Sequence, residues 1–324
     1  LDTNPDIYYT TDGTTPTTTS TLYSGPIIID TTTVLKFFAV DDAGNASPVE
    51  TRTYVIDTEA PAVTADPVGG VYNATFDVVL SVEDNTDAHP TIYYTTDGTI
   101  PTTSSTQYTG AITISGDTNL QFITMDFFGN TSSVQSETYI IDTEAPAVAA
   151  DISTGLFNAT QNVTLTATDN LDTQPDIYYT TDGTTPTMGS TLYSGPITID
   201  VTTSLMFFAV DDAGNMSGVQ TEVYTIDMEA PNVTADPAGV SFNTSKTVAL
   251  AAMDNLDINP DIYYTTDGTT PTMGSILYSG PITVDATTML MFIAVDDAGN
   301  LSDVQSKIYT LDTEAPGVSA SMGS

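Results

Sequence analysis

Cysteine and tryptophan are absent from this 324-residue sequence, and lysine and arginine together number only four. Without cysteine the chain has no disulfides and no thiol chemistry. The four basic residues stand against 42 acidic ones, and the formal net charge is −38. This charge excludes nucleic acid as a partner, because phosphate contacts require Lys and Arg, and it disfavours docking on anionic lipid. No apolar run approaches the ~20 residues of a membrane helix, so we expect no membrane insertion in this segment.

The residues that catalysis usually requires are also scarce. His89 is the single histidine, which removes the partner that a nucleophilic triad needs. The lysines Lys36, Lys246 and Lys307 each stand at a different repeat position, and Arg52 is the only other basic residue, which argues against a Lys–Asn crosslink in every repeat. Carboxylates are plentiful, but none stands in a unique context beside aromatic platforms, as a glycosidase pair would. We therefore expect a protein that is not an enzyme.

What the sequence does contain is a strict repeat. The stretch Ile-Tyr-Tyr-Thr-Thr-Asp-Gly-Thr occurs four times, with its Asp at positions 12, 97, 182 and 267, always 85 residues apart. An Asp-x-x-Gly-Asn turn begins at Asp41, Asp126, Asp211 and Asp296 with the same spacing. A fixed period of this length indicates a tandem array, and an array of near-copies rarely carries a unique catalytic centre.

The repeats are joined by Asp-x-Glu-Ala-Pro segments, whose prolines at 61, 146, 231 and 316 are natural boundaries. Cutting there predicts complete repeats at residues 61–145, 146–230 and 231–315. Residues 1–60 correspond to a repeat that lacks its first strands, and residues 316–324 to the opening strand of a further repeat. We therefore expect the chain to be a window of a longer array.

Within one repeat the pattern is that of β-strands. Residues 76–83 alternate, with Phe76, Val78, Leu80 and Val82 on one face. Further short strands are expected at residues 62–66, 92–96, 108, 111–114, 119–126 and 134–141. About seven short strands separated by turns predict an all-β fold, a tandem array of immunoglobulin-like β-sandwiches with an 85-residue repeat.

Two sets of motifs resemble known families. The stretch Ile-Tyr-Tyr-Thr-Thr-Asp-Gly-Thr-Thr-Pro-Thr at 177–187, followed by Leu-Tyr-Ser-Gly-Pro-Ile-Thr-Ile at 192–199, resembles the chitobiase/β-hexosaminidase C-terminal-type domain. That resemblance implies an immunoglobulin-like sandwich in a secreted or surface protein, without the separate catalytic barrel of such enzymes. The turn at 210–215 and the joint at 227–231 resemble those of tandem bacterial adhesin domains. In those adhesins, joints of this type often carry calcium.

The acidic residues form a recurring set around each joint. In such a sandwich, the loop after the second strand and the loop before the last strand lie at the end where the chain enters. Five carboxylates should therefore converge there, a number of hard oxygen ligands that suits Ca²⁺. The predicted sets are Asp57, Glu59, Asp84, Asp87 and Asp126; Asp142, Glu144, Asp169, Asp172 and Asp211; and Asp227, Glu229, Asp254, Asp257 and Asp296. The alternative is that these side chains cap turns and keep the surface soluble.

Asn-x-Ser/Thr sequons recur in two registers, which predicts glycosylation. The register that falls in a turn between the first two strands is the stronger one: Asn73, Asn158 and Asn243. The other lies in the Gly-Asn turn, where a tight turn also favours Asn: Asn45, Asn130, Asn215 and Asn300.

Together these features predict a structural rod or filament segment of an extracellular, cell-surface protein, stiffened by calcium, with adhesion as an added role. Its expected partners are further copies of itself or of the same array, and surface glycans. At roughly 40 Å per sandwich, nearly four in line would extend ~150 Å. One alternative is a carbohydrate-binding accessory array of a secreted hydrolase, with the outward rings of pairs such as Tyr93 and Tyr94 stacking on sugars. An S-layer lattice protein is the other.

Overall fold

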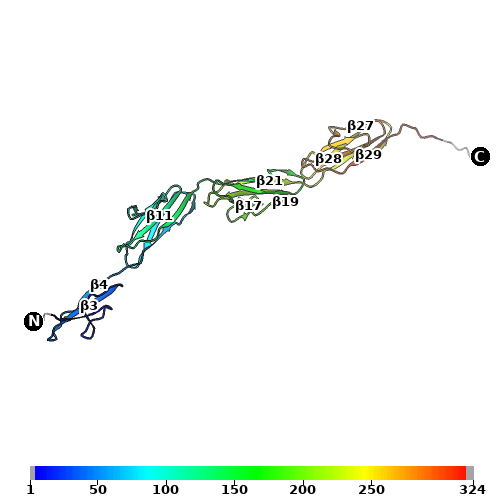
Figure 1. Cartoon of the computed structure of the whole chain (residues 1–324). Helices are drawn as coiled ribbons and strands as arrows, with labels where there is room; N and C mark the ends of the chain where they lie inside the picture. The colour runs from blue at the N-terminus through cyan, green and yellow to red at the C-terminus, as the bar shows by residue number, and fades with distance from the viewer. Residues whose placement is uncertain (1–3, 319–324) are drawn as a thin grey trace, which may run out of the picture. The chain divides into compact units, whose positions relative to one another are not determined.

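The computed structural model describes residues 4–318, which form strands β1 to β29 and no helix (Figure 1). The chain divides into two compact units, residues 1–143 and 144–324, each described separately below. Within the described residues there is thus no helix long and apolar enough to cross a membrane.

The first unit begins with a single four-stranded sheet in the order β2-β1-β3-β4. The strands are β1 (Asp6–Thr10), β2 (Thr21–Leu22), β3 (Thr33–Val40) and β4 (Glu50–Tyr54). Leu35 and Phe37, on the same face of β3, line a cavity of about 330 Å³. The described residues 4–60 therefore contain one sheet layer, while residues 1–3 lie outside the described part.

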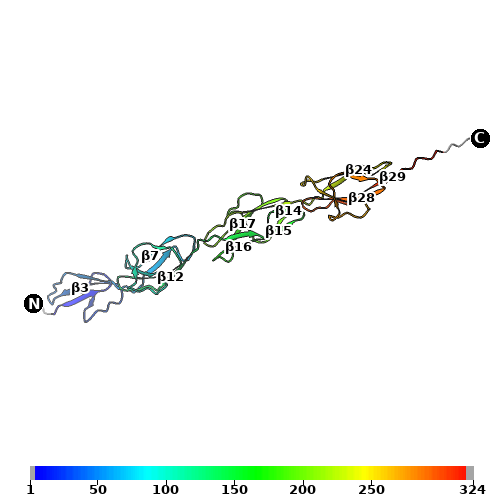
Figure 2. The same ribbon diagram turned by 90° about the horizontal axis from the view of Figure 1, so that it is seen from above.

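The rest of the first unit is a two-layer sandwich (Figure 1; Figure 2). One layer has the order β10-β7-β5 and the other the order β6-β12-β11-β8-β9. All neighbours are antiparallel except β6 and β12, which run parallel. The strands are β5 (Ala62–Asp66), β6 (Gly70–Tyr72), β7 (Phe76–Glu83), β8 (Thr91–Thr95), β9 (Thr106–Gln107), β10 (Ile112–Ile114), β11 (Thr118–Met125) and β12 (Gln135–Ile141).

The core of this sandwich follows from the period-2 alternation of its strands. Val78 and Leu80 point inward from β7, and they meet Leu120 and Phe122 from β11 in one buried cluster. Tyr139 is fully buried in the same cluster and donates its hydroxyl proton to the carbonyl oxygen of Pro67, 2.8 Å away. Fully burying a Val, Leu or Phe side chain stabilises the fold by ~1.5–3 kcal/mol, so this buried cluster holds the two sheets together.

The second unit contains two sandwiches of the same topology. The first of them comprises β13 (Ala147–Ala150), β14 (Gly155–Phe157), β15 (Gln161–Val163), β16 (Leu165–Thr168), β17 (Asp176–Thr180), β18 (Thr191–Leu192), β19 (Ile197–Ile199), β20 (Thr203–Val210) and β21 (Gln220–Ile226). The second comprises β22 (Asn232–Asp236), β23 (Val240–Phe242), β24 (Lys246–Met253), β25 (Asp261–Thr265), β26 (Ile276–Leu277), β27 (Ile282–Val284), β28 (Thr288–Val295) and β29 (Gln305–Leu311). Each has its own buried cluster, around Phe207 and Tyr224 in one and around Phe292 and Tyr309 in the other.

The strand predictions hold with small shifts and several differences. β5 and β7 have the predicted bounds, and the other predicted multi-residue strands shift by one residue or less at either end. The predicted short segment at residue 108 is instead the pair Thr106–Gln107, and β6 was not predicted. In the first sandwich of the second unit the strand equivalent to β7 is divided at Thr164 into β15 and β16, and the N–H of Thr164 donates to the Asp151 carboxylate at 2.7 Å. The equivalent in the second sandwich, β24, is continuous. Residues 316–318 form no strand, and the rest of the predicted opening strand, 319–324, lies outside the described residues.

Candidate metal centre

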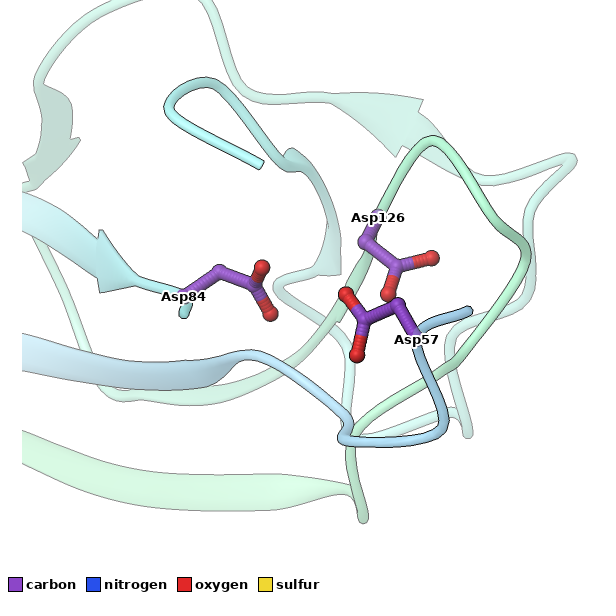
Figure 3. A group of neighbouring side chains, drawn as sticks. All are labelled: Asp57, Asp84 and Asp126. Atoms are coloured by element: carbon purple, nitrogen blue, oxygen red, sulfur yellow. The ribbon is translucent and has the colours of Figure 1, made fainter. Parts of the chain in front are cut away.

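In the first unit the side chains of Asp57, Asp84 and Asp126 converge (Figure 3). One carboxylate oxygen of each lies within 4.8 Å of the corresponding oxygens of the other two. Asp57 belongs to the segment after β4, Asp84 follows the last residue of β7, and Asp126 follows the last residue of β11. The group thus joins the linker to two loops of the sandwich that follows it.

Backbone and amide groups fix the orientation of these carboxylates. Asp57 Oδ1 accepts a hydrogen bond from the N–H of Glu59 at 3.0 Å. Asp84 Oδ2 accepts from the N–H groups of Thr86 and Asp87, at 2.8 and 2.7 Å. Asp126 accepts from both the backbone N–H and the Nδ2 of Asn130, at 2.8 and 2.7 Å.

In two of these aspartates the other carboxylate oxygen has no hydrogen-bond partner in the described part of the chain. Asp57 Oδ2 and Asp84 Oδ1 are buried and have no hydrogen-bond partner among residues 4–318. Leaving a buried acceptor unsatisfied is costly, and more so when it is charged. Among the described residues no ion pair joins a Lys or Arg to these aspartates, and the nearest Arg in the sequence, Arg52, pairs with Glu50 at 3.4 Å. The site therefore has the oxygen donors and the uncompensated negative charge that a hard cation would meet.

Hydrogen bonds lower the pKa of two of these aspartates, Asp126 and Asp254. Burial acts to raise the pKa of Asp126, but the hydrogen bonds from Asn130, Gly129 and Phe128 outweigh it, and the pKa lies below its ordinary value. Asp254 of the second unit behaves in the same way, because backbone N–H groups outweigh the effect of burial on its pKa. Both groups are therefore anionic at neutral pH, as metal ligands must be.

The second unit repeats the arrangement. Asp227, Asp254 and Asp296 each place one oxygen within 4.8 Å of the others. Asp227 and Asp296 are 2% and 6% exposed, and Asp254 Oδ1 is another buried oxygen without a partner in the described part of the chain. In two of the three predicted sets, therefore, one aspartate from the linker and one from each of two loops come together.

The middle predicted set is divided between the two units. Asp142 and Glu144 fall at the end of the first unit and the start of the second. Asp169 and Asp211 lie in the second unit, where Asp169 Oδ2 accepts from the N–H of Leu171 at 2.9 Å, and Asp211 accepts from Asn215. Asp172 Oδ1 accepts from the N–H of Gln174 at 2.8 Å.

The structure does not bring all five residues of a set together. Glu59 lies outside the three-carboxylate group, and its Oε2 accepts from Asn85 Nδ2 at 2.9 Å. Asp87 is also outside the group, and its oxygens accept from the N–H groups of His89 and Phe127, both at 2.9 Å. In the second unit Glu229 and Asp257 are likewise not members. These residues shape the loops around the candidate centre.

The asparagine of the Asp-x-x-Gly-Asn turn has a role that the sequence reasoning missed. Asn130 Nδ2 also donates to the carbonyl oxygen of Asp57 at 3.2 Å, and Asn300 Nδ2 donates to that of Asp227 at 2.8 Å. These two bonds tie a loop to the preceding linker. In the sequence, the recurrence of the five-residue Asp-x-x-Gly-Asn motif in every repeat pointed to this asparagine, but it indicated only a local turn.

The two sequon registers differ in their surroundings. Asn73, Asn158 and Asn243 are exposed and directly follow β6, β14 and β23. In the other register, each asparagine amide donates to the aspartate that opens its turn, as Asn45 does to Asp41 at 2.8 Å. The remaining members, Asn130, Asn215 and Asn300, make the same contact at 2.7–2.8 Å. Glycosylation at Nδ2 in this register would disturb those bonds.

Comparison with known proteins gives one assignment. The chitobiase/beta-hexosaminidase C-terminal domain family matches the chain four times, at residues 2–51, 67–136, 152–221 and 237–306. The comparison with curated proteins found no match.

Solved structures of immunoglobulin and fibronectin(III)-like domains are similar to the chain at low sequence identity. Immunoglobulin domains 1–5 of Sidekick-1 are 15% identical, covering 95% of this chain and 74% of that one, with a TM-score of 0.36. The fibronectin(III)-like modules of Clostridium thermocellum CbhA are also 15% identical, covering 54% and 100%, with a TM-score of 0.32. The extracellular domains 3–5 of Drosophila OTK are 11% identical, covering 79% and 99%, with a TM-score of 0.34. Similarity of this degree says nothing about function.

Proposed function

Because this chain belongs to the chitobiase/beta-hexosaminidase C-terminal domain family, we propose that it is a structural segment of an extracellular surface protein. In this proposal calcium ions held between linker and loop carboxylates stiffen the joints between its repeats. The work of the segment is then to give reach and rigidity, and the repeated surfaces serve contacts with further copies of the array.

The repetition supports a structural role. The four family matches cover all repeats with the same internal spacing, and the features that recur are turns, core positions and joints. Each complete sandwich has a separate core, so each can support its neighbours as a unit of constant length. The family match and the exposed sequons Asn73, Asn158 and Asn243 support an extracellular location.

Calcium is supported by one observation above all. Buried carboxylate oxygens without a hydrogen-bond partner belong to members of the three-aspartate group in both units: Asp57 and Asp84 in one, Asp254 in the other. Ca²⁺ takes 6–8 oxygen ligands in flexible geometry, so three carboxylates with nearby carbonyl groups and water suit it. Mg²⁺ demands a tighter octahedron and gives up its water reluctantly, so it fits less well.

The test is a calcium titration of the whole chain, followed by calorimetry and scanning unfolding, with chelator and magnesium as comparisons. A ligand that binds only the folded form adds RT ln(1 + [L]/Kd), about 2.7 kcal/mol at a hundredfold excess over Kd. We expect calcium to raise the melting temperature and chelator to lower it. Solution scattering under the same conditions should show a less rigid particle after chelation.

Two variants and one control locate the effect. Asp57→Asn and Asp227→Asn each remove one charged linker ligand from a different unit, so each should reduce the calorimetric stoichiometry by one site. Glu83→Gln removes the same charge from an exposed residue next to Asp84 that lies outside the group, and it should bind calcium like the wild type. Equal behaviour of Asp57→Asn and Glu83→Gln, or equal shifts with calcium and magnesium, would disprove the calcium centre.

A further inference from the structure

One turn in the first unit departs from its three counterparts. The two residues after the first aspartate of the Asp-x-x-Gly-Asn turn are Asp-Ala at 42–43, 212–213 and 297–298. At 127–128 they are Phe-Phe. The backbone of this turn is nevertheless the same: Asp126 N donates to Asn130 O at 3.1 Å, as Asp211 N does to Asn215 O. The phenylalanines are therefore not required for the turn to form.

The two rings are presented to solvent. Phe127 is 87% exposed and Phe128 is 44% exposed. Their centroids lie 5.7 Å apart with the ring planes at 89°, an edge-to-face pair. No other Phe or Tyr among the described residues is as exposed as Phe127. Isolated exposed apolar residues are ordinary, but an exposed aromatic pair replacing Asp-Ala adds an apolar surface where the repeat has a charge.

The base of the pair is held firmly. The N–H of Phe127 donates to Asp87 Oδ2 at 2.9 Å, which joins this turn to the neighbouring loop. Asn130 ties the other end of the turn to the linker at Asp57 O. Gly129 has a φ of +93°, which glycine adopts without strain. Because the turn is already held in place, less conformational entropy is lost when a partner binds the rings.

The surroundings decide what kind of partner fits. Asp84, Asp87 and Asp126 lie on the same two loops as the rings, and the sequence contains no Lys or Arg from residue 53 to 245. A second copy of this chain has only four Lys and Arg residues to offer these carboxylates, so contacts with further copies belong to other surfaces of the repeats. Because the two rings stand at 89°, they do not form one continuous flat platform for neighbouring sugar rings. Aromatic faces amid carboxylates attract Lys and Arg side chains through both cation–π and Coulomb terms.

We propose that the Phe127–Phe128 turn is a docking site for a basic peptide segment of another protein, one that carries Lys or Arg beside an apolar side chain. The cationic groups lie against the ring faces and the loop carboxylates, and the apolar side chain covers Phe127. Asp84 and Asp126 belong to the three-carboxylate group, so when that group holds an ion the carboxylate left for the peptide is Asp87, which lies outside it.

The test compares the wild type with the double variant Phe127→Asp/Phe128→Ala, which restores the pair found in the three sister turns. The probe is a labelled synthetic peptide of alternating Lys and Leu, and its binding is followed by fluorescence anisotropy at physiological salt, with calcium and with chelator. A peptide of alternating Lys and Ser is the matched probe without apolar side chains. The variant gains a negative charge, so purely electrostatic binding would become tighter, whereas docking on the rings would become weaker.

We expect the Lys–Leu peptide to bind the variant at least tenfold more weakly than the wild type. The Lys–Ser peptide, which lacks apolar side chains, should bind the variant at least as tightly as the wild type, because the variant carries one more negative charge. Equal or tighter binding of the Lys–Leu peptide by the variant would overturn the proposal. Ring-dependent binding of a neutral chitooligosaccharide without ring-dependent peptide binding would overturn it in favour of a sugar site. Ring-dependent self-association in sedimentation, again without ring-dependent peptide binding, would overturn it in favour of a second copy.

Discussion

The bond from the turn asparagine to the preceding linker can be isolated within this one chain. Asn300→Ala and Asn130→Ala each remove the contacts inside the turn and the bond to a linker carbonyl oxygen. Asn45→Ala removes the same side-chain contact inside the turn, the 2.8 Å bond from Asn45 Nδ2 to Asp41, while the backbone N–H bond of the turn is kept in all three variants. The difference between the variants therefore reports the linker bond.

The distances set the expected magnitudes. The Asn300 Nδ2 to Asp227 O distance of 2.8 Å is well within the normal range for an N–H···O bond. A neutral bond of this kind contributes a net ~0.5–1.5 kcal/mol, and we expect about 1 kcal/mol here. The 3.2 Å bond from Asn130 to Asp57 O lies at the long limit, so about 0.5 kcal/mol is expected there.

The assay is native-state hydrogen exchange, read peptide by peptide in the presence of chelator so that a bound ion cannot mask the effect. One kcal/mol of local opening corresponds to a roughly fivefold change in exchange rate. The peptide spanning 227–231 should therefore exchange about fivefold faster in Asn300→Ala, and the peptide spanning 57–61 about twofold faster in Asn130→Ala. In Asn45→Ala the change should stay within residues 41–47. If the linker peptides exchange at the wild-type rate in both variants, the linker bonds contribute nothing to the joint.

Three further predictions concern the cores, alkaline pH and glycans. Leu120→Ala, Leu205→Ala and Leu290→Ala remove fully buried side chains at one repeat position, so each should cost about 2–5 kcal/mol in urea unfolding and leave the other cores intact. Burial raises the pKa of Tyr139 and of Tyr224 to about 12. Because the folded pKa exceeds the unfolded value of ~10, the contribution of each protonated hydroxyl to stability is fully present below pH 10 and is lost as the pH rises towards 12. Replacing either tyrosine with phenylalanine should flatten that part of a pH–stability curve. In a glycosylating host, Asn73, Asn158 and Asn243 should be modified before Asn130 and Asn300, whose amides are hydrogen-bonded, and unmodified peptides at all three positions in glycopeptide mass spectrometry would refute this.

Much of the fold could be predicted because its strands are locally encoded. The alternation through Val78 and Leu80 identifies β7 and its buried face without any knowledge of the partner sheet. β6 escaped prediction because three residues carry no periodicity, and its parallel pairing with β12 joins Gly70 to Tyr139, far away in the sequence. The break at Thr164 depends on the Asp151 side chain and was equally invisible.

The sequence by itself determined the 85-residue period, the all-β class, and the positions where acids recur around each joint. Only the tertiary structure decided which acids meet. Asp57, Asp84 and Asp126 converge because the linker and two loops are brought to one end of a sandwich. Asp87, on one of the same loops, is not in this group, and it accepts hydrogen bonds from the N–H groups of His89 and Phe127. Residue type is a local property, but convergence and the satisfaction of each oxygen depend on contacts between segments distant in the chain. For that reason the orphaned oxygens and the asparagine bonds to the linker emerged only from the folded chain.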